Sequence, residues 1–428
     1  MTPRALGRLV LGIVAALSVT ITPSAAQTAM TASPAQATTA QAPLTMAAAV
    51  RLATERRAEI EAARARARAG EARPAIVSAL EEPMISPSLD HLPFMFNGAD
   101  VSFTIEQRIP LSPLRQHRRE SALADLERLR AETNKTTLDV GLEAATAFLM
   151  LHERRRMTDL LREQLAFARD VVNAADARYA GATGAQSDVL RAEVEVARIE
   201  AQLAQAAGDI RAAEAMFNAS LGIDADTPAP DLAIPALERP LPAWTDLKTQ
   251  LPARPELAAA RAEITRAEVE VQVMRDMYRP MATIRTGPSY TMTEGRGWMA
   301  MVGLSLPVWR SKLRAGVAEA QAMQQMTEAD LRAMSRMVEG EAAAALNQLH
   351  AASDQQAAIR NNVLPRARVA LDPALAGYAA GRLPLVSVIE AIQALWSVQA
   401  ELIDADVRVG LAWTRLGRAI GSYEVLEP

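Results

Sequence analysis

The chain has 428 residues, of which half are hydrophobic and only 4% aromatic, and its formal charge at neutral pH is −4. The slight negative charge argues against nucleic acid as a partner, and the scarcity of aromatic residues argues against an all-β fold. The sequence contains no cysteine, which excludes disulfides, thiolate metal sites, cysteine nucleophiles and a lipidated N-terminal cysteine.

Residues 1–26 are predicted to be a secretory signal peptide. Arg4 and Arg8 provide its charged region, residues 9–21 its apolar core, and small residues precede a cleavage site after Ala26. The core is too short to span a bilayer, and beyond it we expect no run of about 18 or more apolar residues. Residues 27–43 are rich in Ala, Thr, Gln and Pro, which predicts a flexible leader.

A helix is predicted from Leu44 to about Arg73, with Thr45 as its N-cap and Pro74 near its end. It is followed by a stretch rich in proline and glycine, which would break any helix.

A β-hairpin is predicted at about 81–110. Apolar and polar residues alternate from Val101 to Glu106, as they do in a strand with one apolar face. The segment 82–94 is its expected partner, with a loop near Asn97 and Gly98.

The segment from about 115 to 180 has no proline and is predicted to be one helix. Such a helix is about 100 Å long, which is too long for a globular core and typical of a coiled coil or a helical barrel. A turn at 181–184 reverses the chain. A second helix then returns over 187–221, with Ser187 or Asp188 at its N-cap or in its first turn.

Residues 223–253 are rich in proline and are predicted to be a linker with one short helix around 244–251. The order of elements then repeats, with a helix at 256–278, a hairpin at about 280–308, a long helix at 311–376, a turn at 377–386 and a helix at 387–421.

The repeat is visible in spacing as well as in order. Tyr179 and Gly222 are 43 positions apart, as are Tyr378 and Gly421. Each returning helix has an apolar residue at every seventh position, the pattern of a heptad seam. These residues are Val189, Val196, Leu203, Ile210 and Phe217, and then Val388, Leu395, Leu402, Val409 and Leu416. We therefore predict a tandem repeat with units at 44–222 and 254–422, followed by a tail at 423–428.

Two hairpins supply four strands, which cannot close a barrel, and an isolated hairpin is only marginally stable. Three chains would together supply twelve antiparallel strands, within the size range of membrane barrels, whose strands have about ten residues. The long helices would then form a hollow cylinder at one end of that barrel.

The chain resembles the TolC-like outer-membrane efflux proteins over essentially all of its mature length. The resemblance rests on the doubled Tyr-x-x-Gly turn with its heptads, on RPELAAAR at 254–261, and on the junctions IPLSPLR at 109–115 and LPVWRSKLRAGVAEA at 306–320. Within the family, EEPMISPSLDHLPF at 81–94 and the run YRPMATIRTGPSY from 278 are most similar to the CzcC-type heavy-metal branch.

The resemblance implies a mainly α fold with membrane β: a homotrimer with a twelve-strand outer-membrane barrel and a periplasmic α-helical barrel. It implies membrane lipid, a periplasmic adaptor and an inner-membrane RND-type pump as partners, and heavy-metal cations as substrate. A channel of the same fold for drugs, small molecules or type I protein secretion stays open. An alternative of another class is a secreted coiled-coil scaffold without a pore.

In the family such helical turns close the pore and meet the adaptor. Glycine in them would permit a tight reversal. The alternative is that they are merely turns, with no role in pore closure or adaptor binding. The predicted site residues are Tyr179, Gly181, Gly184, Asp188, Tyr378, Gly381, Pro384 and Ser387. Asp188 would form an acidic ring if it faced a threefold lumen; otherwise it is a charge that suits a helix N-terminus.

Thioethers favour soft ions such as Cu(I), but we expect the methionines chiefly to fill irregular gaps. They are Met274, Met277, Met281, Met292, Met299, Met301, Met323, Met326, Met334 and Met337. The histidines are His91, His117, His152 and His350, and no pair has metal-ligand spacing. With no Ser/His/Asp constellation, phosphate loop or dinucleotide fingerprint, we predict neither an enzyme nor a cofactor.

Overall fold

The structure is a computed structural model that describes residues 43–90, 100–233 and 239–423, all within one compact unit. The predicted signal peptide and nearly all of the leader lie outside the described residues. So do His91, the predicted hairpin loop at Asn97 and Gly98, and residues 424–428 of the predicted tail.

The described residues of the first half form four helices and two strands. They are α1 (Met46–Arg56), α2 (Ala58–Ser78), β1 (Met84–Asp90), β2 (Asp100–Pro110), α3 (Leu114–Ala180) and α4 (Gln186–Ser220). The 67 residues of α3 confirm the predicted long helix. Thr45 caps α1 as predicted, because its hydroxyl accepts a hydrogen bond from the Ala48 N–H at 3.2 Å.

The single helix predicted at the start of this half is wrong in one respect, because the chain is extended at Arg57 and separates α1 from α2. Pro74 lies inside α2, four residues before the end of the helix. Ile60, Ala63, Gly70 and Pro74 are the buried residues of α2, so Pro74 is on the buried face of the helix. Burial there offsets the loss of one backbone hydrogen bond.

The second half repeats this order after the linker. It comprises α5 (Trp244–Gln250) with a 3-10 turn (η1, Leu251–Ala253), α6 (Pro255–Asp276), β3 (Met281–Thr291), β4 (Gly295–Ser305), α7 (Arg310–Ala358), a π turn (η2, Ile359–Val363), α8 (Leu364–Ala379) and α9 (Leu385–Ile420). The short helix predicted in the linker is confirmed as α5.

The long helix predicted over 311–376 is interrupted by the π turn. Pro365 follows that turn as the second residue of α8. Proline has no N–H to donate, and its ring clashes with the carbonyl four residues earlier in a regular α-helix. A π turn, which is wider by one residue, changes this spacing just before the proline.

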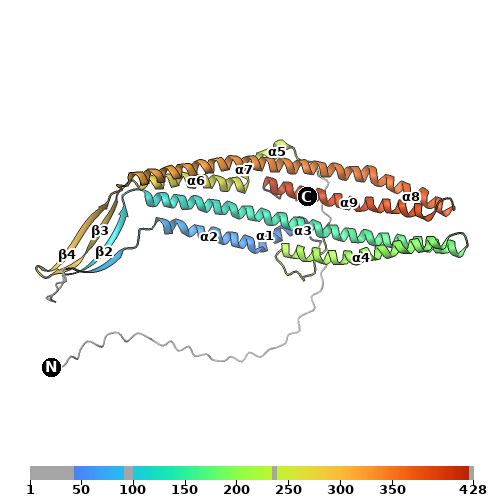
Figure 1. Cartoon of the computed structure of the whole chain (residues 1–428), viewed down its shortest axis with the longest axis horizontal. Coiled ribbons are helices and arrows are strands. Elements are labelled where there is room, and N and C mark those ends of the chain that lie inside the picture. Colours follow the sequence, from blue (N-terminus) through green and yellow to red (C-terminus); the bar gives the residue numbers. More distant parts are fainter. Residues whose placement is uncertain (1–42, 91–99, 234–238, 424–428) are drawn as a thin grey trace, which may run out of the picture. The chain divides into compact units, whose positions relative to one another are not determined.

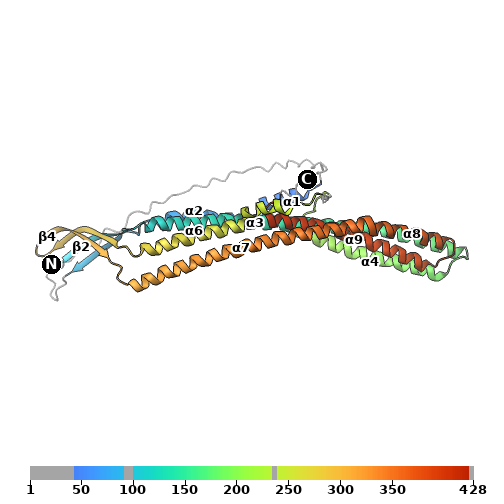
Figure 2. The ribbon, with the colours of Figure 1, turned by 90° about the horizontal axis from the view of Figure 1, so that it is seen from above.

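The long helices are covered by shorter ones placed one after another. Figures 1 and 2 show α2 and α4 along successive parts of α3, and α6 and α9 between α3 and α7. Every position of the two predicted heptad seams is buried or half-buried, which confirms the seams. The largest core cluster includes Phe148 of α3 and Phe217 of α4, whose rings pack edge to face with centroids 6.2 Å apart.

Among the described residues, α9 is the one helix that is long and apolar enough to cross a membrane by length and composition. The helix contains no uninterrupted run of 18 apolar residues, because Glu390, Gln399 and Asp404 are among the polar residues that interrupt it, so our expectation is not contradicted. Length and composition are weak evidence, because a core helix passes the same test. The helix packs on α3, α7 and α8, and Val409 and Leu416 of its seam belong to the main core.

The four strands within the described ranges form one antiparallel sheet in the order β1-β2-β3-β4. The two halves of the chain join through the β2–β3 pair, in which Glu106 lies opposite Arg285. Gly287 is required at this junction, because a Cβ atom there would lie 1.9 Å from the Phe103 carbonyl oxygen.

An ion-pair cluster in which the side chains of Arg254 and Glu256 are buried lies where α6 begins and α9 ends. Arg254 donates to Glu256 at 2.8 Å and to Glu341 at 2.9 Å, and Arg418 donates to Glu256 at 2.7 Å and to Asp139 at 2.7 Å. Burial alone would raise the pKa of Glu256, but hydrogen bonds from the two arginines outweigh it and lower the pKa to about 2.

We predict that Glu256→Gln lowers the free energy of unfolding at neutral pH by about 3 kcal/mol, because it removes one partner of a buried ion pair. The pKa of Glu256 is lower in the folded chain than its ordinary value of 4.5. Its stabilisation is therefore present above pH 4.5 and is lost as the pH falls toward 2. Denaturant unfolding followed by circular dichroism should show wild type and variant converging over that interval.

Glu263→Gln, on the same helix but more exposed, is the matched control and should cost less than 1 kcal/mol. The assignment would be contradicted if the difference in unfolding free energy between wild type and Glu256→Gln stayed constant from pH 7 to pH 2.

Candidate functional site: the two helix turns

The turns between α3 and α4 and between α8 and α9 have the same backbone hydrogen bonds. In the first, the N–H groups of Thr183 and Gly184 donate to the Arg178 carbonyl at 2.9 and 3.0 Å. In the second, those of Arg382 and Leu383 donate to the Gly377 carbonyl at 2.8 and 3.1 Å. The two turns are therefore structural equivalents, 199 positions apart.

Each turn has one residue in the left-handed conformation, and the two are at equivalent positions. Gly381 has φ +68°, but its equivalent is Ala182 with φ +57°, whereas Gly181 has φ −79°. Gly181 therefore does not supply the left-handed conformation. An alanine in that conformation costs about 1 kcal/mol, so Ala182 is a strained position.

Glycine serves a different purpose at Gly184 and Gly377, because both make room for a neighbouring side chain. A Cβ on Gly184 would lie 3.0 Å from Cβ of Arg178, and one on Gly377 would lie 2.6 Å from Cδ1 of Leu383. Arg178 and Gly377 are equivalent positions, as are Gly184 and Leu383. The large and small residues are thus exchanged between the turns.

Arg178 connects the two turns, a role that was not predicted from the sequence. Its guanidinium lies 4.5 Å from the centroid of the Tyr378 ring, and it donates to the carbonyls of Tyr378, Ala379 and Thr183. The one available signal was a cation in the last turn of α3, where the helix dipole favours positive charge.

The two tyrosines of the repeated motif have different surroundings. Tyr179 is 48% exposed, whereas Tyr378 is buried in a small core with Ala192, Leu385 and Val388. Its hydroxyl is buried and has no hydrogen-bond partner among the residues that the structure describes. Burial and the nearby charge of Asp188 raise the pKa of Tyr378, and Arg178 opposes them.

The remaining predicted residues lie on the first turns of the returning helices. Asp188 and Ser387 are half-buried, and Pro384 is exposed as the N-cap of α9. The N-cap of α4 is Ala185, so Ser187 and Asp188 occupy its first turn instead. Asp188 lies close enough to Tyr378 to affect its pKa, and the acidic ring stays a prediction.

The sheet provides a second candidate surface, because its polarity is the reverse of that of a soluble sheet. Ser102, Thr104 and Glu106 of β2 are buried, while the alternate side chains Val101, Phe103 and Ile105 are exposed. We call these the polar and the apolar face. On the polar face Ser88 and Ser102 are joined by a hydroxyl hydrogen bond of 2.7 Å, and Glu106 pairs with Arg285.

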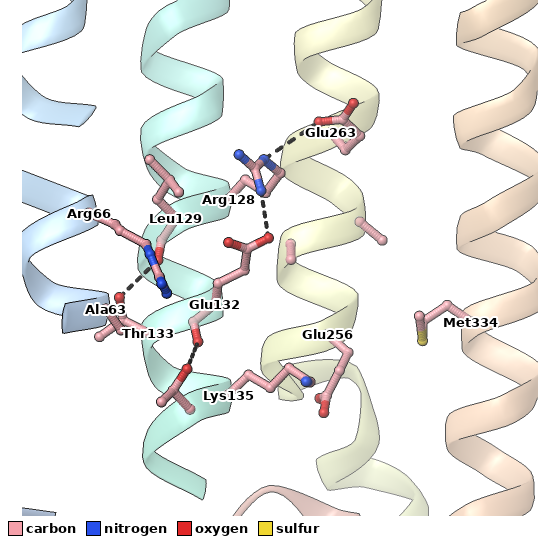
Figure 3. Close-up of a pocket in the computed structure, with 13 residues that line it drawn as sticks. Ala63, Arg66, Arg128, Leu129, Glu132, Thr133, Lys135, Glu256, Glu263 and Met334 are labelled. Atoms are coloured by element: carbon pink, nitrogen blue, oxygen red, sulfur yellow. Dashed lines mark hydrogen bonds and ion pairs between the residues drawn. The ribbon is translucent and has the colours of Figure 1, made fainter. Parts of the chain in front are cut away.

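A groove of about 530 Å³ lies between α2, α3 and α6, with Met334 of α7 at its edge (Figure 3). Charged groups that line it form ion pairs with one another. Arg128 lies 2.5 Å from Glu132 and 3.8 Å from Glu263. Elsewhere His117 contacts Asp276 at 2.7 Å. Within the described ranges no three or more His, Asp or Glu side chains are grouped as metal ligands would be.

We predict that Gly381→Val disrupts the second turn, because a β-branched residue is strongly disfavoured at positive φ. Gly181→Ala is the matched control, since its Cβ would meet no atom closer than 3.4 Å at an ordinary φ. Limited trypsin digestion should cleave after the exposed Arg382 several times faster in Gly381→Val alone. Equal cleavage of both variants would show that the turn does not depend on this conformation.

Comparison with known proteins identifies relatives of both the sequence and the fold. The family model for outer membrane efflux proteins matches residues 49–223 and 247–422. The cobalt-zinc-cadmium resistance protein CzcC of Cupriavidus metallidurans is 27% identical over 58% of this chain and 59% of its own length. The outer membrane efflux protein BepC of Brucella suis is 25% identical over 70% of this chain and 66% of its own. The matches thus span less than two thirds of either relative.

Solved outer-membrane channels share the fold. OprN superposes with a TM-score of 0.74 at 17% identity, covering 88% of this chain and 90% of its own. CusC superposes with a TM-score of 0.77 at 14% identity, covering 88% and 92%. These likenesses confirm the predicted fold class, and the match to CzcC confirms the predicted similarity to that branch. With both repeats matched by the family model, the chain belongs to the outer membrane efflux protein family.

Proposed function

We propose that three copies of this chain form a passive channel through the outer membrane, which carries heavy-metal cations from an inner-membrane pump and a periplasmic adaptor to the exterior. The observation that carries the proposal is the sheet with an apolar face turned to solvent. Within water such a face is unfavourable, whereas in a bilayer the same pattern suits strands with lipid on one side and a polar lumen on the other.

The edges of the sheet support assembly. Within the described part of the chain, strands β1 and β4 each pair on one side only. Open strand edges do not occur in the hydrocarbon region of a bilayer. Three copies would close all edges in a ring of twelve strands. Strands β2, β3 and β4 each have 11 residues, close to the number needed for a tilted strand to cross a bilayer.

Exposed aromatic side chains support the same placement. Phe103, Tyr290 and Trp298 lie near the hairpin loops, and Trp309 follows β4 at the opposite end, next to α7. Trp298 is 70% exposed and Trp309 75%. Aromatic girdles at both interfaces are typical of membrane barrels. The sheet would thus anchor the chain in lipid, with the predicted signal peptide removed.

The two turns are the proposed contact with the adaptor and the proposed site of pore closure. They lie at the far end of the helices from the sheet (Figure 1), where a periplasmic partner could reach them. Tyr179, Leu383 and Val386 expose apolar surface there, and such surface on a turn is suited to a protein contact. Gly181, Gly184, Gly381 and the first-turn residues would shape this contact.

The relation to CzcC supports metal cations as the substrate, and transport would require no catalysis or cofactor. The relation to BepC covers a larger share of this chain, and it keeps a channel for other small molecules or secreted polypeptide as the second candidate. A scaffold without a pore would leave the apolar face of the sheet without a partner.

We predict that deleting the gene lowers tolerance to at least one of zinc, cobalt, cadmium, copper or silver by several-fold, and that the tagged protein fractionates with the outer membrane. A plasmid copy should restore tolerance, and the same plasmid with Gly381→Val should restore less than one with Gly181→Ala. Sensitivity to antibiotics and detergents alone would favour the second candidate. A soluble periplasmic protein would contradict both channel functions.

A further inference from the structure

The register of β4 assigns two methionines to the polar face of the sheet. Met301 lies opposite Arg285, which itself lies opposite and pairs with Glu106. Met299 lies two residues earlier on the same strand and so shares that face. Trp298 is on the apolar face instead, because its indole N–H donates to Thr286 at 2.7 Å.

These methionines have almost no neighbours of any size on their own strand. The residues of β4 that share their face are Gly295, Gly297, Gly303 and Ser305, and Gly287 lies opposite Met299. Met299 and Met301 are therefore the two large side chains on this face of the strand. They are 36% and 43% exposed, so each side chain has an accessible part.

Gap filling, which we expected to explain most methionines, does not explain these two. Met334 fits that explanation, because it packs against the main helical core. Met299 and Met301 are exposed and belong to neither core cluster of the described residues. They also depart from the alternation that places Trp298, Val302 and Leu304 on the apolar face. An apolar residue on the lumen side of a strand weakens the pattern that seats the sheet in lipid.

Thioether chemistry offers a reason for the departure. Sulfur ligands of this kind select soft monovalent ions such as Cu(I), whereas carboxylate and water suit hard ions. Side chains at i and i+2 on a strand start about 7 Å apart, and flexible methionines can bring two sulfurs to one ion. Glu106, which lies in register with Arg285 and Met301, is already paired with Arg285, so we assign the sulfurs as the ligands.

We propose that Met299 and Met301 together form a transient binding site for Cu(I) or Ag(I) on the lumen face of β4. The inference rests on the proposed function, because it needs this face to line a metal-conducting channel. Two neutral ligands bind an ion without holding it strongly, as conduction requires: an ion must both enter a site and leave it.

The direct test is a titration of the purified full-length protein in detergent with Cu(I), kept reduced by ascorbate, against a chromogenic Cu(I) chelator. The double variant Met299→Leu/Met301→Leu keeps size and apolarity but removes both sulfurs. It should bind Cu(I) at least tenfold more weakly than wild type at one site per chain. The matched control is Met323→Leu/Met326→Leu, which removes two exposed thioethers of α7 and should leave that site unchanged.

Undiminished binding by the β4 variant, or an equal loss in the α7 variant, would overturn the proposal. Metal tolerance of the deletion strain carrying these variants on plasmids distinguishes failure of the Cu(I) site proposal from failure of the proposed function. The β4 variant should restore zinc and cobalt tolerance fully but silver tolerance several-fold less well than wild type. Full restoration of silver tolerance would reject the site and keep the channel. A deletion strain with no metal phenotype would reject metal efflux, and the titration would still decide whether the site binds Cu(I).

Discussion

A helix of 67 residues has no globular core to lie against, and much of the structure depends on how α3 is covered along its length. α2 and α4 divide that task between them, while α6 and α9 separate α3 from α7 (Figures 1 and 2). The seams contain many alanines, so helix backbones can approach closely and dispersion contacts accumulate over a long interface. Stability is thereby distributed along the helices, with one denser region around Phe148 and Phe217.

Hydrogen-bond donors are needed where one covering helix ends and the next begins, because the end of a helix leaves carbonyl groups without partners. Arg57 supplies them in the first half, donating to the Ser220 carbonyl at 3.1 Å and to Glu59 and Glu143. Arg254 holds the equivalent place in the second half, with Glu256 and Glu341 as its partners. The same Arg-x-Glu segment thus fixes the start of α2 and of α6.

Local patterns were enough to predict most elements, and remote contacts explain what they missed. The absence of proline predicted α3, the heptads predicted the seams of α4 and α9, and alternation predicted β2. The break at Arg57 could not be predicted, because it depends on Ser220, far along the chain. At the candidate site, glycine indicated where the turns lie but not which residue is left-handed, and the role of Arg178 depends on Tyr378, 200 positions later.

The exchange of bulk between the two turns has a consequence for how the repeat evolves. Arg178 occupies the volume left by Gly184, and Leu383 occupies the volume left by Gly377, so the members of each pair are coadapted. Neither turn can be converted into the other by one substitution, because the intermediate would have two large residues in one place or two small ones. The two turns of the repeat therefore stay different in sequence. Any partner that contacts both turns meets two distinguishable surfaces on each chain.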